Sequence, residues 1–224
     1  MGQVNEATSS GTVPTGGRRR NPRGQGDQLR REILAAVGRL LDEKLDEGAL
    51  SVSLREVARE TGIAAQSMYL HFADKDQLAH AVAEDGYQRV VAAMRAADAR
   101  AATDEADAGT RLRAQSDAFC AFARTNRGVF RLMFGHDTSR LGFADQAHPA
   151  HVLWQQWLDA VRSCEDEGLH WPDGPEHVAM YLWSALFGRF ALWASTFGQD
   201  DPETLYTFAH RTIDALLRDA TRHG

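Results

Sequence analysis

The residues best suited to bind a polyanion lie between positions 65 and 71. Ala65, Gln66, Ser67, Tyr69 and His71 are small or hydrogen-bonding, and none of them is acidic. Side chains of these types approach nucleic-acid bases and phosphates without charge repulsion. The amide of Gln66 is able to pair with adenine through two hydrogen bonds, which makes it the best candidate for reading a base.

Two short helices joined by a tight turn are expected to position these side chains. Ser53 and Glu56 have the S-x-x-E spacing of a capping box, so the first of these helices should begin at Ser53. Gly62 should end that helix, because the tight turn needs the left-handed conformation that glycine adopts readily. The second helix is expected over about residues 65–71. A small apolar centre is supplied by Leu54, Val57, Ala58, Ile63, Met68 and Phe72.

The run from Val52 to Phe72, continued to Leu78, resembles the DNA-binding domain of TetR-type regulators. The matching features are Leu-Arg-x-Val-Ala-x-x-x-Gly-Ile, then a small-residue helix ending in Tyr-x-His-Phe, then x-x-Lys-x-x-Leu. The resemblance covers about residues 28–80 and implies a helix-turn-helix that binds double-stranded DNA. It implies a transcriptional repressor that is released from its operator by a small molecule.

The resemblance also implies two kinds of DNA contact. Contacts to the phosphate backbone are implied for Ser53, Arg55, Tyr69, His71 and Lys75. Contacts to bases are implied for Ala65, Gln66 and Ser67. The alternative is that Tyr69 and His71 only cover the small core and that Arg55 is solvated.

Charge is distributed unevenly along the chain. Residues 18–75 hold 11 Lys and Arg against 9 Asp and Glu, whereas the whole chain has a net charge of -6. Nucleic-acid binding is therefore expected in the N-terminal third. Residues 1–26 are rich in Gly, Ser, Thr, Asn and Arg, which predicts a disordered basic arm. Its arginines either reach the minor groove or only add solubility, and the sequence leaves both open.

The remaining sequence predicts helices throughout, and so an all-α fold with no sheet. A first helix is expected from about Asp27 to Leu45, with Gly48 ending it. A further capping pair, Asp74 with Gln77, should start a fourth helix that extends towards Ala102. Later helices are expected at about 110–126, 128–135 and 148–167, then after Asp173–Glu176 and Asp201–Glu203, where Pro occupies the first turn.

This pattern predicts two domains after the arm. Residues 27–75 are expected to form the three-helix DNA-binding domain, and residues 76–224 a helical effector-binding and dimerisation domain. The last two helices carry apolar stripes that suit a four-helix bundle between two copies of the chain. A homodimer would read a palindromic operator. The expected interface residues are Val178, Leu182, Leu205, Phe208, Thr212, Ile213 and Leu216.

Aromatic residues are dense in the middle of the chain. The runs Phe122–Phe134 and Trp183–Gly188 resemble the C-terminal half of one TetR subgroup, in which Trp, His and Gly often mark the later run. Phe187 stands at the middle position here and supplies no polar group. An apolar cavity among helices is the usual place for a small ligand, so an apolar or aromatic effector is expected. The expected lining residues are Phe119, Phe122, Phe130, Phe134, Trp154, Trp157, Trp183 and Phe187.

Two other classes of protein are alternatives to this interpretation. An enzyme is disfavoured, because His148 and His151 form one weak pair near His136 and Asp137, and Cys120 has no catalytic motif around it. No metal or cofactor site is expected. A second alternative is a helical protein-interaction or small-molecule-binding protein without DNA binding. The two cysteines and the absence of a signal peptide or membrane span predict a cytoplasmic protein.

Overall fold

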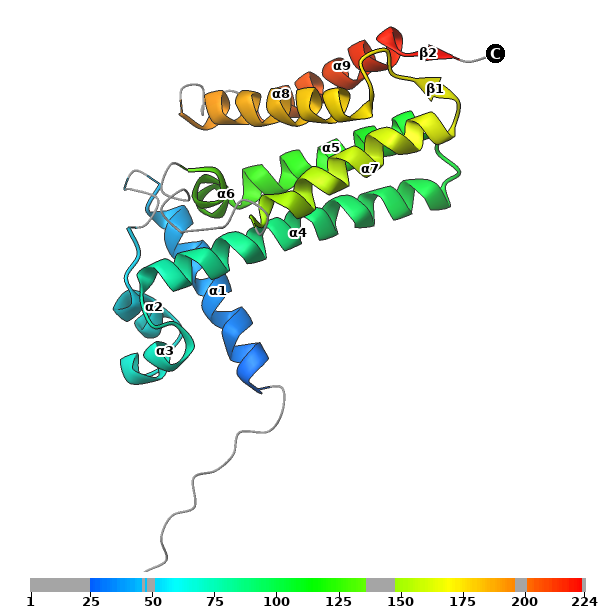
Figure 1. The fold of residues 1–224 in the computed structure, drawn as a ribbon. Helices are drawn as coiled ribbons and strands as arrows, with labels where there is room; N and C mark the ends of the chain where they lie inside the picture. Colours follow the sequence, from blue (N-terminus) through cyan, green and yellow to red (C-terminus); the bar gives the residue numbers. More distant parts are fainter. Residues whose placement is uncertain (1–24, 46, 48–50, 136–147, 196–200, 223–224) are drawn as a thin grey trace, which may run out of the picture.

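The computed structural model describes residues 25–45, 47, 51–135, 148–195 and 201–222. Figure 1 shows a long helix, α4, with α5 and α7 beside it. Helices α8 and α9 form an outer layer beyond α5 and α7, on the side away from α4. The short helices α2 and α3 lie at one end of the molecule, next to α1. In chain order the helices are α1 (Gln25–Glu43), α2 (Leu54–Glu60), α3 (Ala65–His71), α4 (Lys75–Thr103), α5 (Ala108–Thr125), α6 (Arg127–Phe134), α7 (Ala150–Asp166), α8 (Pro175–Ser195) and α9 (Glu203–Asp219).

The predicted all-α architecture is confirmed, and the helix ends lie within about two residues of the expected positions. The predicted end of the first helix at Gly48 lies outside the described residues. A small addition is an antiparallel pair of two-residue strands, β1 (Leu169–His170) and β2 (Thr221–Arg222). Strands this short leave no alternating pattern in the sequence, which explains why no pairing was predicted.

The predicted cap at Asp74 is present. The carboxylate oxygen Oδ1 of Asp74 accepts a hydrogen bond of 2.7 Å from the backbone N–H of Gln77. In a capping box the side chain of Gln77 would in return accept a hydrogen bond from the N–H of Asp74. Here it accepts one of 2.9 Å from the N–H of the preceding residue, Ala73. These bonds satisfy N–H groups that the first turn of a helix leaves without partners, so they fix where α4 begins relative to α3.

Helix α6 is packed tightly against both α1 and α4. Its Gly128 lies so close to α1 that a Cβ atom there would be 2.5 Å from the carbonyl carbon of Leu41. On the other side of α6, Sδ of Met133 lies 2.6 Å from the position that a Cβ atom would take at Gly86 of α4. The hydroxyl of Tyr87 also donates a hydrogen bond of 2.8 Å to the carbonyl of Met133. These contacts join the C-terminal half to the first helix.

Polar contacts fix the outer helix α9 on α5. Arg113 forms an ion pair with Asp214, with 2.6 Å between Nη2 and Oδ1. Asp117 lies 2.7 Å from Nε2 of His210. Burial raises the pKa of the Asp117 carboxyl above its usual value, although His210 acts in the opposite direction.

None of the described helices is long and apolar enough to cross a membrane.

Candidate nucleic-acid interface and ligand cavity

The start of α2 is held by the predicted capping box. The Ser53 side chain accepts a hydrogen bond from the N–H of Glu56, and the Glu56 carboxylate accepts bonds from the N–H and hydroxyl of Ser53 at 2.9 and 2.8 Å. Lys44, which follows α1, places its Nζ 2.7 Å from Oε1 of the same carboxylate. The hydrogen bond from Lys44, together with those from Ser53, lowers the pKa of Glu56 from 4.5 to about 2.

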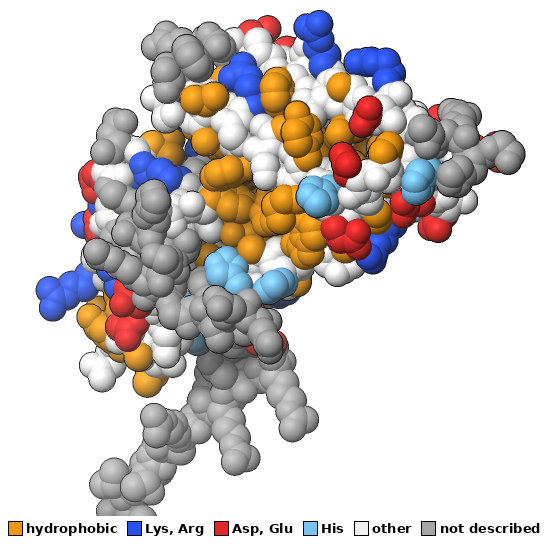
Figure 2. Space-filling view, turned by 45° about the horizontal axis from the view of Figure 1, so that its top comes forward, with side chains coloured by type: hydrophobic (Ala, Val, Ile, Leu, Met, Phe, Trp, Pro, Cys, Tyr) orange, Lys and Arg blue, Asp and Glu red, His pale blue; other side chains and the backbone are white. Residues whose placement is uncertain are grey.

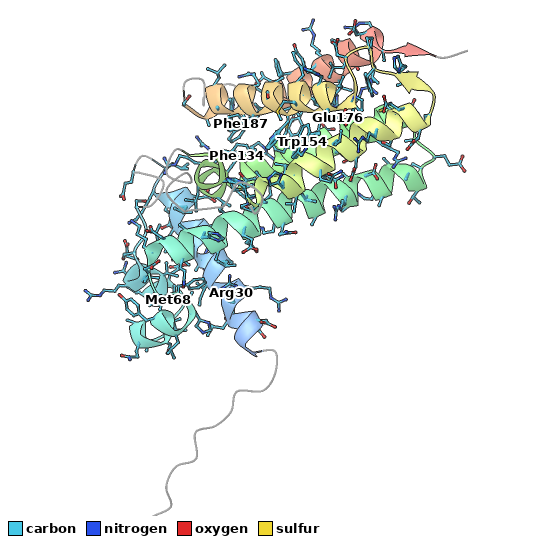
Figure 3. All side chains as sticks on the ribbon, in the orientation of Figure 1. Arg30, Met68, Phe134, Trp154, Glu176 and Phe187 are labelled. Carbon is cyan, nitrogen blue, oxygen red and sulfur yellow. The ribbon has the colours of Figure 1, made fainter. Side chains whose placement is uncertain are left out.

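Helix α3 is anchored by its apolar side. Met68 is fully buried and Phe72 is nearly so, and Figure 3 shows Met68 between α3 and the neighbouring helices. Gly62 has φ of 69°, which confirms the left-handed turn predicted there. Because Met68 and Phe72 are four residues apart, they occupy one face of the helix and leave the opposite face to solvent.

The exposed face of α3 carries three of the predicted DNA-binding residues. Ala65 and Gln66 are exposed, and Tyr69 has 51% of its surface accessible. Ser67 and His71 are half-buried at the flank of the helix. The helix itself contains no acidic residue. This surface is therefore open and free of acidic side chains, as contact with bases and phosphates favours.

Three further predicted residues lie at the ends of the neighbouring helices. Arg55 in the first turn of α2 and Lys75 at the start of α4 are both exposed. Ser53 is exposed as well, but its hydroxyl donates to Glu56 in the capping box. The acidic side chains of α2 are held in ion pairs, Glu56 with Lys44 and Glu60 with Arg39.

Leu70 is a surface residue of α3 that the sequence analysis did not single out. Its side chain is 79% exposed, more than any other large hydrophobic side chain among the described residues. The spacing from Met68 and Phe72 contained the signal, because a residue midway between two buried residues of one helical face points away from that face. An exposed leucine on this helix offers an apolar contact to a thymine methyl group.

A cavity of about 460 Å³ lies where α6 and α8 meet the end of α1. Three of the eight residues predicted for an effector pocket line it, namely Phe130, Phe134 and Phe187. Figure 3 shows Phe134 and Phe187 facing each other between α6 and α8, with ring centres 5.0 Å apart. The remaining lining residues in the described part of the chain are Leu45, Arg127, Arg131, Gly135, Phe190, Ala191, Ala194 and Ser195.

The other five predicted pocket residues lie outside this cavity lining. Phe119 and Trp157 are buried in the core, with ring centres 5.5 Å apart. Phe122 is buried beneath the guanidinium of Arg89, which lies 5.5 Å from the ring centre. Trp154 and Trp183 are partly buried and pack against the core. These aromatic residues stabilise the helical bundle instead of enclosing the cavity.

The predicted dimer residues fall into two groups. Leu182, Leu205 and Ile213 are buried within the chain, where they join α8 and α9 to the bundle. The second group lines a groove of about 790 Å³ between α8 and α9, and consists of Val178, Phe208, Thr212 and Leu216. Tyr181 lies at the same groove with 63% of its surface exposed. Figure 2 shows hydrophobic side chains gathered across the helical C-terminal half, with acidic and basic side chains around them.

The candidate catalytic residues that the structure describes are Cys120, His148 and His151, and these do not come together in a reactive site. Burial raises the pKa of the Cys120 thiol from 9.0 to about 12, which keeps it protonated at neutral pH. His148 uses Nδ1 to accept a hydrogen bond of 3.1 Å from the N–H of Ala150. His136 and Asp137 lie outside the described residues. No group of three or more His, Cys, Asp and Glu suited to a metal occurs in the part of the chain that the structure describes.

Two family models match the chain. Residues 41–82 match the DNA-binding model of bacterial regulatory proteins of the tetR family. Residues 112–216 match the model of a tetracyclin repressor-like C-terminal domain. The first match contains α2 and α3, and the second contains α6 and α8, which line the cavity.

Solved structures share the fold over most of the chain. A protein of unknown function from a Rhodococcus species is 27% identical with a TM-score of 0.70, and the alignment covers 87% of this chain and 95% of that one. A TetR family regulator from Marinobacter aquaeolei is 20% identical, with a TM-score of 0.66 and coverage of 90% and 100%. The TetR family regulator PfmR of Thermus thermophilus is 19% identical with a TM-score of 0.60, and the alignment covers 83% of this chain and 97% of that one. The chain therefore belongs to the TetR family and is a DNA-binding transcriptional regulator, not an enzyme.

Proposed function

We propose that this protein is a cytoplasmic repressor that binds a palindromic operator as a homodimer and leaves it when a small apolar or aromatic effector enters the cavity. The observation that carries the DNA-binding part is the exposed face of α3. Gln66, Tyr69 and Leu70 project from it, and no acidic residue of the helix opposes DNA. Arg55 and Lys75 are exposed in the first turns of α2 and α4, the helices before and after α3 in the chain, and are suited to phosphate contacts.

The homodimer is proposed from α8 and α9. A single short recognition helix gives modest affinity, and two copies related by symmetry read two half-sites. Tyr181 and Leu192 are exposed on α8 and lie about three helical turns apart, which places them on one face of the helix. Together with the groove between α8 and α9 they form an apolar surface that suits a second copy of the same surface.

Ligand control is proposed from the position of the cavity. Arg131 lines the cavity and donates hydrogen bonds to the backbone carbonyls of Leu45 and Lys44, directly after α1. Lys44 in turn pairs with Glu56 in the first turn of α2. A ligand that moves α6 therefore acts on the residues that position the helix-turn-helix, which supports effector control of DNA binding.

Selection of bound DNA from a random pool tests this function directly. A repressor dimer should enrich an inverted repeat whose half-sites are separated by about one helical turn, roughly 34–36 Å. The purified full chain should then bind this repeat more tightly than a single half-site. Enrichment of no sequence, together with no retention on random DNA, would favour the helical protein-interaction or small-molecule-binding alternative.

A further inference from the structure

The cavity between α6 and α8 combines aromatic walls with positive charge. Its walls include four phenylalanines, Phe130, Phe134, Phe187 and Phe190. Arg127 and Arg131 also line it, and no acidic side chain does so among the described residues. Cavities of about this volume hold ligands of drug-like size. Two partly buried cations with no acidic partner among the described lining residues are unusual in an apolar site, because charges in such a site are normally paired.

Both arginines have hydrogen-bonding capacity left over. The Nε atoms of Arg127 and Arg131 are buried and have no hydrogen-bond partner within the described part of the chain. The guanidinium of Arg127 lies 5.3 Å from the ring centre of Trp193, a contact that fixes its position without satisfying its N–H groups. A guanidinium charge in an apolar site is costly without a counter-charge, and an anionic ligand would supply one together with acceptors of the geometry that guanidinium groups bind best.

We infer that the effector is an organic anion, an aromatic body carrying a carboxylate, with the body among the four phenylalanines and the carboxylate held by Arg127 and Arg131. This inference rests on the proposed ligand control and specifies the class of ligand. The aromatic body accounts for the apolar walls, and the carboxylate accounts for the two arginine side chains that line the same cavity. A neutral apolar ligand would leave both guanidinium charges without a counter-charge.

Arg131 gives this ligand a direct effect on the DNA-binding end. Its two terminal nitrogens bond the carbonyls of Leu45 and Lys44, next to the ion pair of Lys44 with Glu56. A carboxylate is a stronger partner for a guanidinium than a neutral carbonyl is. The bound anion therefore competes for Arg131 and loosens the junction between α1 and α2. Operator affinity falls as a result.

Binding of matched acids and amides tests the ligand class. The probes are benzoate, 2-naphthoate and 4-phenylbutyrate, each compared with its uncharged amide by calorimetric titration of the full chain. At least one acid should bind about tenfold or more tightly than its amide, the range of a charge-assisted hydrogen bond. Arg127→Gln removes the positive charge but keeps a polar, hydrogen-bonding side chain, and it should abolish this preference. Arg124→Gln, on the exposed end of α5, should preserve it.

Three results would overturn the inference. These are binding of none of the acids, equal binding of an acid and its amide, and an unchanged preference in Arg127→Gln. Thermal unfolding of each variant without ligand shows whether it is folded, so loss of binding is not mistaken for loss of structure. The titration needs no DNA, so it decides the ligand class even if the chain fails to bind an operator. If the bound acid leaves operator affinity unchanged, the competition at Arg131 is wrong.

Discussion

The ammonium group of Lys44 lies 2.7 Å from a carboxylate oxygen of Glu56 and so joins the end of α1 to the first turn of α2. The backbone carbonyl of the same lysine accepts a hydrogen bond from Arg131 of α6. Lys44 therefore contacts the helix-turn-helix with its side chain and the ligand-cavity helix with its main chain. Two elements far apart in sequence meet at this one residue.

The Lys44–Glu56 pair predicts a specific dependence of stability on pH. The pKa of Glu56 is lowered from 4.5 to about 2 in the folded chain, so its contribution to stability is complete above pH 4.5. The contribution is lost as the pH falls from 4.5 towards 2. Urea unfolding should show that Glu56→Gln is less stable than the natural chain at pH 7, with a difference that shrinks across this window.

Glu60→Gln is the matched control for that measurement. Glu60 is one turn further along α2 and pairs with Arg39, but both side chains are more exposed than those of Lys44 and Glu56. Exposed ion pairs contribute only about 0–1 kcal/mol. A difference for Glu56→Gln that is constant from pH 7 to pH 2 would contradict the assigned role of its charge.

Because α6 packs closely on α1, we expect a single methyl group added at Gly128 to lower the unfolding free energy markedly. The Cβ of Gly128→Ala would meet the backbone of Leu41 at 2.5 Å, and backbone atoms move less readily than the end of a side chain. Overpacking of this kind costs about 1–3 kcal/mol of unfolding free energy. Gly188→Ala in α8 has no neighbouring atom within 4 Å and should instead stabilise its helix, by roughly 0.5–1 kcal/mol. Equal effects of the two changes in denaturant unfolding would rule out this close approach.

The helix-turn-helix could be predicted from sequence because its determinants are local. The S-x-x-E spacing of Ser53 and Glu56 fixes the start of α2, and Gly62 adopts the positive φ that the turn requires. The apolar spacing around Met68 likewise identified the buried face of α3. Each of these features depends on residues within one or two helical turns, which is the range over which sequence patterns are informative.

The cavity could not be assembled from sequence in the same way. Phe119 and Phe134 are equivalent as residue types, yet the first is buried in the core and the second lines the cavity. Helical periodicity shows that a face is covered but not what covers it. For the same reason the apolar stripes of the last two helices, which include Leu182 and Ile213, suggested a dimer surface, whereas both residues are buried within the chain. Arg127 and Arg131 were missed because only the tertiary structure places them beside aromatic rings.

Gln66 and Lys75 should have separable effects on DNA binding. Gln66→Ala removes a side chain suited to reading adenine and should relax the preference at one position of each half-site, at a cost of about 1–3 kcal/mol in discrimination. Lys75→Ala removes a phosphate contact and should weaken all sequences alike. It should also reduce the slope of log affinity against log salt by about one per contact. Identical behaviour of the two variants in binding titrations at several salt concentrations would contradict both assignments.

Leu70 should contribute an apolar contact to base recognition. Its side chain is 79% exposed in the free protein, so Leu70→Ala should leave the unfolding free energy nearly unchanged. In operator binding the same change should reduce the preference for thymine over cytosine at one position, because the C5-methyl group of thymine loses its partner. Leu70→Met preserves an apolar side chain and should retain the preference. An unaltered preference in Leu70→Ala would show that Leu70 does not contact a base.

The exposed face of α8 should be the centre of the dimer interface. Tyr181 and Leu192 are 63% and 53% exposed and share one helical face, so an acidic residue at either position would place two like charges near the symmetry axis. Sedimentation velocity at micromolar concentration should show a dimer for the natural chain and a monomer for Tyr181→Asp and Leu192→Asp. Leu70→Asp introduces the same charge on an exposed leucine of α3 and should remain dimeric.

The DNA-binding consequence distinguishes a functional dimer from simple self-association. Because each subunit supplies one recognition helix, monomeric Tyr181→Asp should lose most of its affinity for the inverted repeat. Its affinity for an isolated half-site should remain close to that of the natural chain, since α3 is unaltered. A Tyr181→Asp chain that still sediments as a dimer would place the interface elsewhere. A monomeric variant with full affinity for the repeat would show instead that pairing through α8 is not what the operator requires.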